Sequence, residues 1–430
     1  MNRKLLFVFM ILTLAGATLL AGCGGTASEP EGPVTVVYWR ALTGAKGDVQ
    51  DELAARFNEA QDDIIVDVQF QGEYGELVQK LQAAIAANAL PDMVLLDSPF
   101  VVLFAKDNIL VPLDDFAADE EIGVDLDNYM EGLLSDGYYK GKLYALPLMR
   151  STPLLYYNAD MFAEAGLPDR VPETWDEFKE FCDKLTIVED GEIKQQGVSF
   201  TMGTTSAHWY LQAAIYAYGG EVSDEDFNIL LTEPKAMAAA QLWQDIVFKY
   251  ETGKAGVDEG GSHGDFLNHR VGMVFGSTGS MGGLIEKSDF TLGAGMIPEQ
   301  ERRQVPVGGS VIAMTSTDEA RQKAAWEFMK YMTNATSNYE VVIQTGYLPT
   351  SQAALEYGPM VKYFETYPER AIALEQLKYA RPQATVISLA KGTEILRQVV
   401  EKLLVGNIPV QQVMEEATVD LTTEYEESFK

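Results

Sequence analysis

Strand-like and helix-like segments alternate after residue 34, and this alternation constrains the fold more than any other feature. Residues 34–39 (VTVVYW) are β-branched and aromatic, as strands are. In residues 47–60, Val49, Leu53 and Phe57 recur every four positions, which predicts a one-faced helix. Residues 92–97 (DMVLLD) form a short apolar run typical of a buried parallel strand. Strand-helix-strand order predicts an α/β layer with helices on both faces.

The length of the chain predicts more than one core. Removing residues 1–22 from the 430 leaves 408, too many for one ordinary hydrophobic core, so we expect two lobes. The pattern becomes more helical past residue 200, with clear amphipathic helices in 233–250 and 318–333. Thr174 and Glu177 form a probable capping box that starts a helix at Trp175.

The first 33 residues have the layout of an export signal and a tether. Arg3 and Lys4 precede an uncharged run that ends in LLAGC, residues 19–23, as in a secretory signal peptide. The small residues before Cys23 look like a bacterial lipobox, so residues 1–22 are expected to be removed and Cys23 acylated. An uncleaved membrane anchor is the alternative, because about 18 apolar residues just span a bilayer. Residues 23–33 read as the lipidated cysteine and a flexible tether.

Charge and cysteine content exclude several classes of partner. The formal charge of −32 argues against nucleic acid and repels anionic bilayers. Of the two cysteines, Cys182 is left alone if Cys23 carries lipid, so no disulfide is expected. Cys182 has helical spacing with Phe178 and Leu185, which predicts a buried residue and not a nucleophile.

Motifs for cofactor or metal chemistry are missing from the sequence. The three histidines have no metal-ligand spacing, and neither CxxC nor HExxH occurs. The glycine-rich residues 276–283 lack the ending of a phosphate-binding P-loop and the order of a nucleophile elbow. We therefore expect no cofactor, no metal and no enzyme. With 64 acidic residues, a glycosidase carboxylate pair is not excluded by counting.

Several ordered segments carry a family resemblance. Residues 145–167 (ALPLMRSTPLLYYNADMFAEAGL) and 345–355 (TGYLPTSQAAL) are the strongest, and 266–280, 305–314 and 36–58 match in pattern. In these segments the chain resembles extracytoplasmic solute-binding proteins of ATP-driven carbohydrate importers, in particular the members that bind glycerol-3-phosphate. The landmarks together cover nearly the whole mature chain.

The resemblance implies an α/β fold of two lobes, the type II periplasmic-binding-protein (Venus-flytrap) fold, with multiple hinge crossings. One lobe would comprise residues 34–148 plus 306–346, and the other residues 149–305 plus 347–430. The ligand would lie in the cleft between them. Residues 145–158 would be a crossing strand, which accounts for the polar break Arg-Ser-Thr within an apolar run; a strand end facing water is the alternative.

Seven positions of this chain match ligand-binding positions of the family, and Asp97, which adjoins one of them, is an eighth candidate. The eight candidates are Tyr74, Asp97, Ser98, Ser151, Trp209, Ser277, Gly309 and Tyr347. Ser98 stands where the relative has a glutamate, and the neighbouring Asp97 supplies a substitute carboxylate. At Gly309, a missing side chain would let a backbone N–H approach the ligand. Tyr74 reads alternatively as a surface aromatic, and Trp209 as ordinary core.

The expected ligand class follows from one position at which this sequence differs from the family pattern. The family member's phosphate-binding arginine is not reproduced in residues 381–392, where Thr385 or Lys391 lies opposite it; Arg381 or Arg150 would be a replacement. The expected ligand is therefore first a neutral sugar or polyol, and second glycerol-3-phosphate or a glycerophosphodiester.

The expected partner is an ABC permease, for a monomer that is lipid-anchored outside the cytoplasm. A lipoprotein hydrolase and a structural surface lipoprotein or adhesin remain as rivals from other classes.

Overall fold

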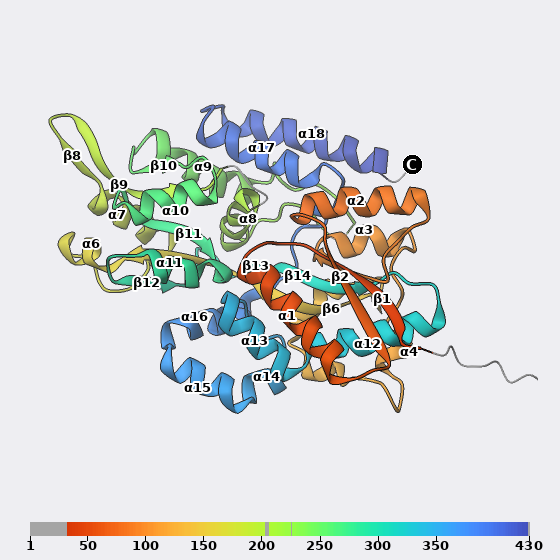
Figure 1. Ribbon diagram of the computed structural model, residues 1–430. Coiled ribbons are helices and arrows are strands. Elements are labelled where there is room, and N and C mark those ends of the chain that lie inside the picture. Colours follow the sequence, from red (N-terminus) through yellow and green to blue (C-terminus); the bar gives the residue numbers. More distant parts are fainter. Residues whose placement is uncertain (1–31, 203–205, 225, 429–430) are drawn as a thin grey trace, which may run out of the picture.

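The computed structural model describes residues 32–202, 206–224 and 226–428 (Figure 1). The signal, Cys23 and nearly all of the tether lie outside these residues. The first sheet has five strands, in the order β2 (Ile64–Phe70), β1 (Val34–Arg40), β3 (Met93–Asp97), β14 (Gly308–Met314) and β6 (Ala145–Ser151). β1 is parallel to β2 and β3, as the alternation predicts, whereas β14 is antiparallel to both of its neighbours.

Helices cover both faces of the first sheet. The longer ones are α1 (Ala45–Ala60), α2 (Tyr74–Ala87), α3 (Phe100–Lys106), α12 (Glu319–Thr333) and α13 (Ala335–Thr345). α12 packs against β1, β14 and β6, although more than 200 residues separate it from β1 in sequence. Its Phe328 lies edge-on to Tyr38 of β1, with ring centroids 5.6 Å apart. One apolar core therefore joins the beginning of the chain to residues 308–345.

The second sheet follows the order β10 (Gly253–Ala255), β9 (Glu192–Phe200), β11 (Val271–Ser277), β7 (Pro153–Asn158) and β12 (Leu292–Gly295), and β8 (Ile187–Glu189) pairs with β9. Its main helices are α7 (Trp175–Leu185), α8 (Ala207–Ala217), α9 (Pro234–Phe248), α10 (Glu259–Leu267), α17 (Gly392–Leu404) and α18 (Val410–Ser428). Figure 1 shows this body on the left, with α17 and α18 across its top.

Local chemistry explains the best-formed of these helices. Thr174 caps α7, because its hydroxyl accepts the N–H of Glu177 at 3.1 Å. The other half of the expected capping box is not formed, since the Glu177 carboxylate accepts the N–H of Glu173 and not that of Thr174. Cys182 lies on the buried face of α7, and burial raises the pKa of its thiol well above the usual range. The thiol is therefore an apolar core group, as expected from its spacing.

Short elements complete the fold. They are α4 (Asp114–Ala117), α5 (Glu131–Leu134), β4 (Tyr138–Tyr139), β5 (Lys142–Leu143), α6 (Ala159–Glu164), α11 (Met281–Lys287), β13 (Val305–Pro306), α14 (Gln352–Glu356), α15 (Gly358–Thr366), α16 (Pro368–Gln376), β15 (Ala380–Arg381) and five 3-10 turns at 126–128, 135–137, 278–280, 377–379 and 385–388.

The chain passes between the two sheets at the end of β6. Ser151 is still paired with Gly308 in the first sheet, and Pro153 is already paired with Ser277 in the second. Thr152 alone separates the two strands. The polar break in this apolar run thus lies where the sheets meet, and it brings the edges of both sheets together.

Candidate functional site

A pocket of about 150 Å³ lies where the two sheets meet, and we call it the inner pocket. It is lined by Lys46, Tyr74, Asp97, Ser151, Ser206, His208, Trp209, Ser277, Ser280, Gly308, Gly309, Tyr347 and Gln383. Seven of the eight sequence-predicted site residues are in this lining; Ser98 is the exception. The structure therefore brings together residues that are up to 273 positions apart, as from Tyr74 to Tyr347.

Strand ends and helix starts position these side chains. Asp97 ends β3, Ser151 ends β6 and Ser277 ends β11, so polar groups follow directly after buried strands. Lys46 lies in the first turn of α1 and Tyr74 begins α2. In α/β sheets, loops at the carboxyl ends of parallel strands meet at one edge, which is where ligands bind.

Tyr74 starts α2 behind a complete capping box made by Glu73 and Glu76. The ring is half-buried and packs on the first core. Its hydroxyl faces Ser310 and Tyr347, yet no described residue makes a well-formed hydrogen bond with it. Burial raises the pKa of this phenol well above its ordinary value, so the hydroxyl keeps its proton as a donor.

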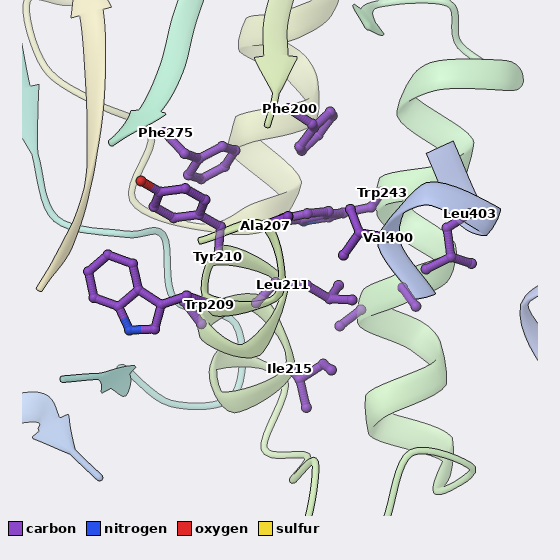
Figure 2. Close-up of a cluster of buried hydrophobic side chains, with 14 of the residues drawn as sticks. Phe200, Ala207, Trp209, Tyr210, Leu211, Ile215, Trp243, Phe275, Val400 and Leu403 are labelled. Carbon is purple, nitrogen blue, oxygen red and sulfur yellow. The ribbon is translucent and has the colours of Figure 1, made fainter. Parts of the chain in front are cut away.

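Trp209 belongs to the hydrophobic core and also lines the inner pocket. Both interpretations of this residue from the sequence, cleft wall and core, therefore apply. Figure 2 shows its indole on one side of α8 and Trp243 on the other. The ring is 6% exposed, and its centroid lies 5.5 Å from that of Tyr210. A Cβ at Gly308 would lie 2.8 Å from Cζ2 of the indole, so a glycine is needed there to seat the ring.

Gly309 has a structural reason of its own to be glycine. Its φ of +89° is in the region that L-residues rarely adopt, and a Cβ would lie 2.0 Å from the carbonyl oxygen of Met149. The Gly309 carbonyl accepts the N–H of Ser98 at 3.1 Å and the Nη1 of Arg150 at 3.0 Å. Gly309 therefore shapes the pocket wall whether or not a ligand touches it.

Ser98 lies behind the pocket and not on its wall. It is 1% exposed, and its hydroxyl donates to the carboxylate Oδ2 of Asp136 at 2.8 Å. Asp97, the alternative carboxylate, is partly exposed and lines the pocket. Consecutive residues at the end of a strand point to opposite sides, so only one of the two reaches the cleft.

Six lining residues were not predicted from the sequence: Lys46, Ser206, His208, Ser280, Gly308 and Gln383. Lys46 is the only lysine or arginine in this lining, and its Nζ lies 5.4 Å from the ring centroid of Tyr347. Its position just after β1, at the carboxyl end of a parallel strand, was the available signal. Burial lowers the pKa of His208 to about 4, so this imidazole is neutral at physiological pH.

A larger cavity adjoins the inner pocket, and we call it the outer cavity. It has a volume of about 500 Å³ and shares Lys46 with the inner pocket. Its lining includes Glu73, Glu286 and Arg370. The lysine therefore lies at the junction of a small polar pocket and a wider, charged opening.

Comparison with known proteins identifies the family to which this two-lobed protein belongs. Residues 52–371 match the model of a family described as bacterial extracellular solute-binding protein. This chain belongs to that family. Relatives include two sn-glycerol-3-phosphate-binding periplasmic proteins, both named UgpB. The one from Agrobacterium fabrum is 25% identical over 402 residues, covering 86% of this chain and 88% of the relative. The one from Brucella melitensis is 24% identical over 445 residues, covering 96% and 97%.

Solved structures agree with the fold. UgpB from Mycobacterium tuberculosis, in complex with glycerophosphocholine, is 28% identical with a TM-score of 0.82, covering 93% of this chain and 100% of that one. The cyclic α-maltosyl-1,6-maltose binding protein of Arthrobacter globiformis has a TM-score of 0.77 at 22% identity, covering 91% and 99%. The second likeness concerns the fold alone. The expected two-lobed α/β fold of periplasmic solute-binding proteins is confirmed.

In this solute-binding protein, neither the residues opposite the family's phosphate-binding arginine, Thr385 and Lys391, nor the expected replacements, Arg381 and Arg150, line the inner pocket. Arg381 pairs with Glu221 at 2.8 Å and covers the ring of Tyr216. Lys391 pairs with Glu424 at 2.8 Å, and Thr385 donates to the carbonyl of Asp224. Arg150 is fully buried beneath the pocket wall.

Two further findings concern the part of the solute-binding protein that the structure describes. No described helix has both the length and the apolar character needed to cross a bilayer. Within the same residues, His, Cys, Asp and Glu side chains form no cluster of three or more that would suit a metal ion.

Proposed function

We propose that this protein is the substrate-binding component of an ABC importer that holds a small polyhydroxylated solute in the inner pocket. The observation that carries this proposal is the convergence of four serines, one carboxyl, three tyrosine or tryptophan rings and one lysine from both sheets on a single small pocket. Aromatic faces such as Trp209 pack on C–H patches, while hydroxyl and carboxyl groups bond the ligand's hydroxyls. The seven sequence-predicted residues that line the pocket, which include Asp97 but not Ser98, are the proposed contacts.

A glycerol phosphate or glycerophosphodiester is the ligand class with most support. Lys46 provides a cation at the pocket, beside Tyr347. This lysine was not among the site residues predicted from the sequence. A phosphate oxygen near Lys46 would gain a charge-assisted hydrogen bond. The relatives' names point to the same class, and the small inner pocket with a wider cavity beyond Lys46 suits a glycerol unit carrying a substituent.

A neutral sugar is the second candidate, and Asp97 favours it. A carboxyl on the pocket wall suits hydroxyl donors and opposes a nearby phosphate anion. The described lining also contains no arginine that would hold a phosphate through two hydrogen bonds.

The proposal includes capture without chemistry and a place at the membrane. Ligand would be released unchanged to the permease when the lobes open, whereas a hydrolase would return products. Acylated Cys23 and residues 24–33 would hold the protein beside that permease. Ligand shifts the open and closed forms only through its different affinity for each.

Titration calorimetry of the mature protein with sn-glycerol-3-phosphate, glycerophosphocholine and glucose tests the ligand class. For Lys46→Gln we expect affinity for the two phosphate compounds to fall about ten- to a hundredfold, because a hydrogen bond to a charged group contributes about 1.5–3 kcal/mol. Affinity for glucose should be unchanged. Lys323→Gln, on the exposed face of α12 far from the lining, is the matched control.

Equal affinity of wild type and Lys46→Gln for the two phosphate compounds would reject the proposal that Lys46 binds the phosphate of a glycerol-phosphate ligand. Binding of glucose alone would establish the neutral-sugar candidate instead. Binding of none of the three compounds would reject the proposed pocket chemistry.

A further inference from the structure

Two carboxyl groups and one guanidinium lie together beneath the inner pocket. Asp97 is on the pocket wall, while Arg150 and Asp136 are behind it with side-chain exposures of 0% and 6%. They come from β3, β6 and the 3-10 turn 135–137, so the cluster is fixed by three separate elements. Buried charges need partners, and here one cation lies near two acids but forms an ion pair with only one of them, Asp136.

Among the described residues, the hydrogen bonds of Arg150 go to Asp136 and to the Gly309 carbonyl, and none goes to Asp97. Its Nη2 forms an ion pair with Oδ2 of Asp136, and its Nη1 donates to the carbonyl of Gly309 at 3.0 Å. The Asp136 oxygen also accepts the hydroxyl of Ser98 at 2.8 Å. Within the described chain, no lysine, arginine or histidine forms an ion pair with Asp97.

We propose that Asp136 is a positioning residue: by holding Arg150 in an ion pair it leaves Asp97 without a counter-ion, so that ligand binding requires Asp97 to lose its proton. This inference rests on the proposed function. It names Asp136, which is not in the lining of the inner pocket, as the residue that sets the pH range of binding.

The electrostatic environment of Asp97 supports this arrangement. Burial above all raises the pKa of Asp97 to about 7; Arg150 acts in the opposite direction, and the charge of Asp136 adds to the rise. The other titratable groups that face the pocket are Tyr74, Tyr347, Lys46 and His208. Burial keeps His208 neutral and Tyr74 protonated, so neither changes charge near pH 7.

The protonation state of Asp97 decides what it offers a ligand. Ionised, it accepts hydrogen bonds from ligand hydroxyls, and such charge-assisted bonds are the strong ones. Protonated, it offers a weaker acceptor and one donor. If only the ionised form binds, apparent affinity is reduced by the fraction ionised, which predicts about a tenfold loss from pH 8 to pH 6.

Calorimetry with glycerophosphocholine between about pH 5.5 and pH 8.5 tests the inference. A phosphodiester and a quaternary ammonium do not titrate in this range, so the protein alone supplies the pH dependence. We expect wild-type affinity to rise about tenfold from pH 6 to pH 8, with a proton released on binding near pH 7. Buffers of different ionisation enthalpy count that proton.

Three variants separate the roles. In Asp136→Asn, Arg150 is free to pair with Asp97, so the midpoint of the affinity profile should move at least about one pH unit lower. The amide oxygen still accepts the Ser98 hydroxyl, which favours folding. Ser98→Ala removes a hydrogen bond to Asp136 without changing its charge, and should keep the wild-type midpoint. Asp97→Asn should bind weakly with a flat profile.

Each outcome decides the matter. Tight binding that is independent of pH in wild type, affinity that falls as pH rises, or an unmoved midpoint in Asp136→Asn would each overturn this inference and leave the proposed function intact. Binding of neither glycerophosphocholine nor glucose at any pH would overturn the proposed function itself.

A carbon-13 NMR titration of the Asp97 carboxyl in wild type, assigned with Asp97→Asn, decides the inference if Asp136→Asn fails to fold. A midpoint near 7 supports it, and one below about 5 overturns it.

Discussion

At the residue scale, Gly309 connects the pocket wall to the buried charged group Arg150 through hydrogen bonds of its backbone carbonyl. Its carbonyl accepts hydrogen bonds from both the Ser98 N–H and the Arg150 guanidinium, and its φ is +89°. The family pattern marked the same glycine for close ligand approach. The conformation adds a second reason, because any side chain would collide with the backbone of β6.

Gly309→Ala should therefore lower the free energy of unfolding by about 2–4 kcal/mol, from positive φ and from a Cβ placed 2.0 Å from the Met149 carbonyl oxygen. Urea unfolding followed by tryptophan fluorescence measures this. Gly264→Ala is the control: Gly264 lies inside α10 with open space around its Cβ position, so alanine should be neutral or stabilise by up to about 1 kcal/mol. Equal stability of both variants would contradict the argument.

Most pocket residues were predictable from motifs, and the exceptions have local causes. Ser98 was misplaced because alternation at the end of β3 sends Asp97 to the pocket and Ser98 behind it. Lys46 was missed because a lysine in the first turn of a helix has no distinctive pattern. The Asp136–Arg150 pair was beyond sequence reasoning, since nothing in residues 135–151 indicates that the two side chains meet.

At the element scale, the junction of β6 and β7 depends on a distant helix. Gln376 at the end of α16 is fully buried; its Nε2 donates to Thr152 Oγ1 at 3.0 Å and to the Pro153 carbonyl at 2.6 Å. Its Oε1 accepts the N–H of Ile297 at 2.9 Å. The sequence predicted a polar crossing at residues 150–152, but not the glutamine 224 residues away that satisfies it.

Gln376→Ala should destabilise the protein by about 2–4 kcal/mol, since it leaves a buried N–H and a buried carbonyl without partners and adds a cavity. The melting temperature and urea midpoint measure the loss. Gln412→Ala on α18 is the control, because that side chain is exposed and bonds only a neighbouring glutamate, so its change should stay within about 0.5 kcal/mol. A melting temperature for Gln376→Ala equal to that of the control would show that the junction does not depend on this glutamine.

At the scale of the whole molecule, chain length predicted two lobes, and the family resemblance predicted a strand at residues 145–158 that crosses between them. Alternating segments indicated the parallel strands β1, β2 and β3. The strand order of the first sheet was not readable, because β14 inserts between β3 and β6 from more than 150 residues further along the chain. Such pairing depends on shape and burial in the assembled core, which a local pattern does not contain.

The negative charge of the whole molecule makes it possible to test whether a lipid on Cys23 holds the protein at the membrane. The formal charge of −32 becomes −34 without Arg3 and Lys4, so an anionic bilayer repels the body and only a covalent lipid would retain it. We expect wild type in the membrane fraction after a wash in about 1 M salt, which screens electrostatic contacts to about 3 Å. Cys23→Ser should be recovered as soluble protein with unchanged melting temperature, because the substitution changes none of the residues that form the two main cores. Retention of Cys23→Ser through the salt wash would mean that an uncleaved apolar segment, and not a lipid, holds the protein.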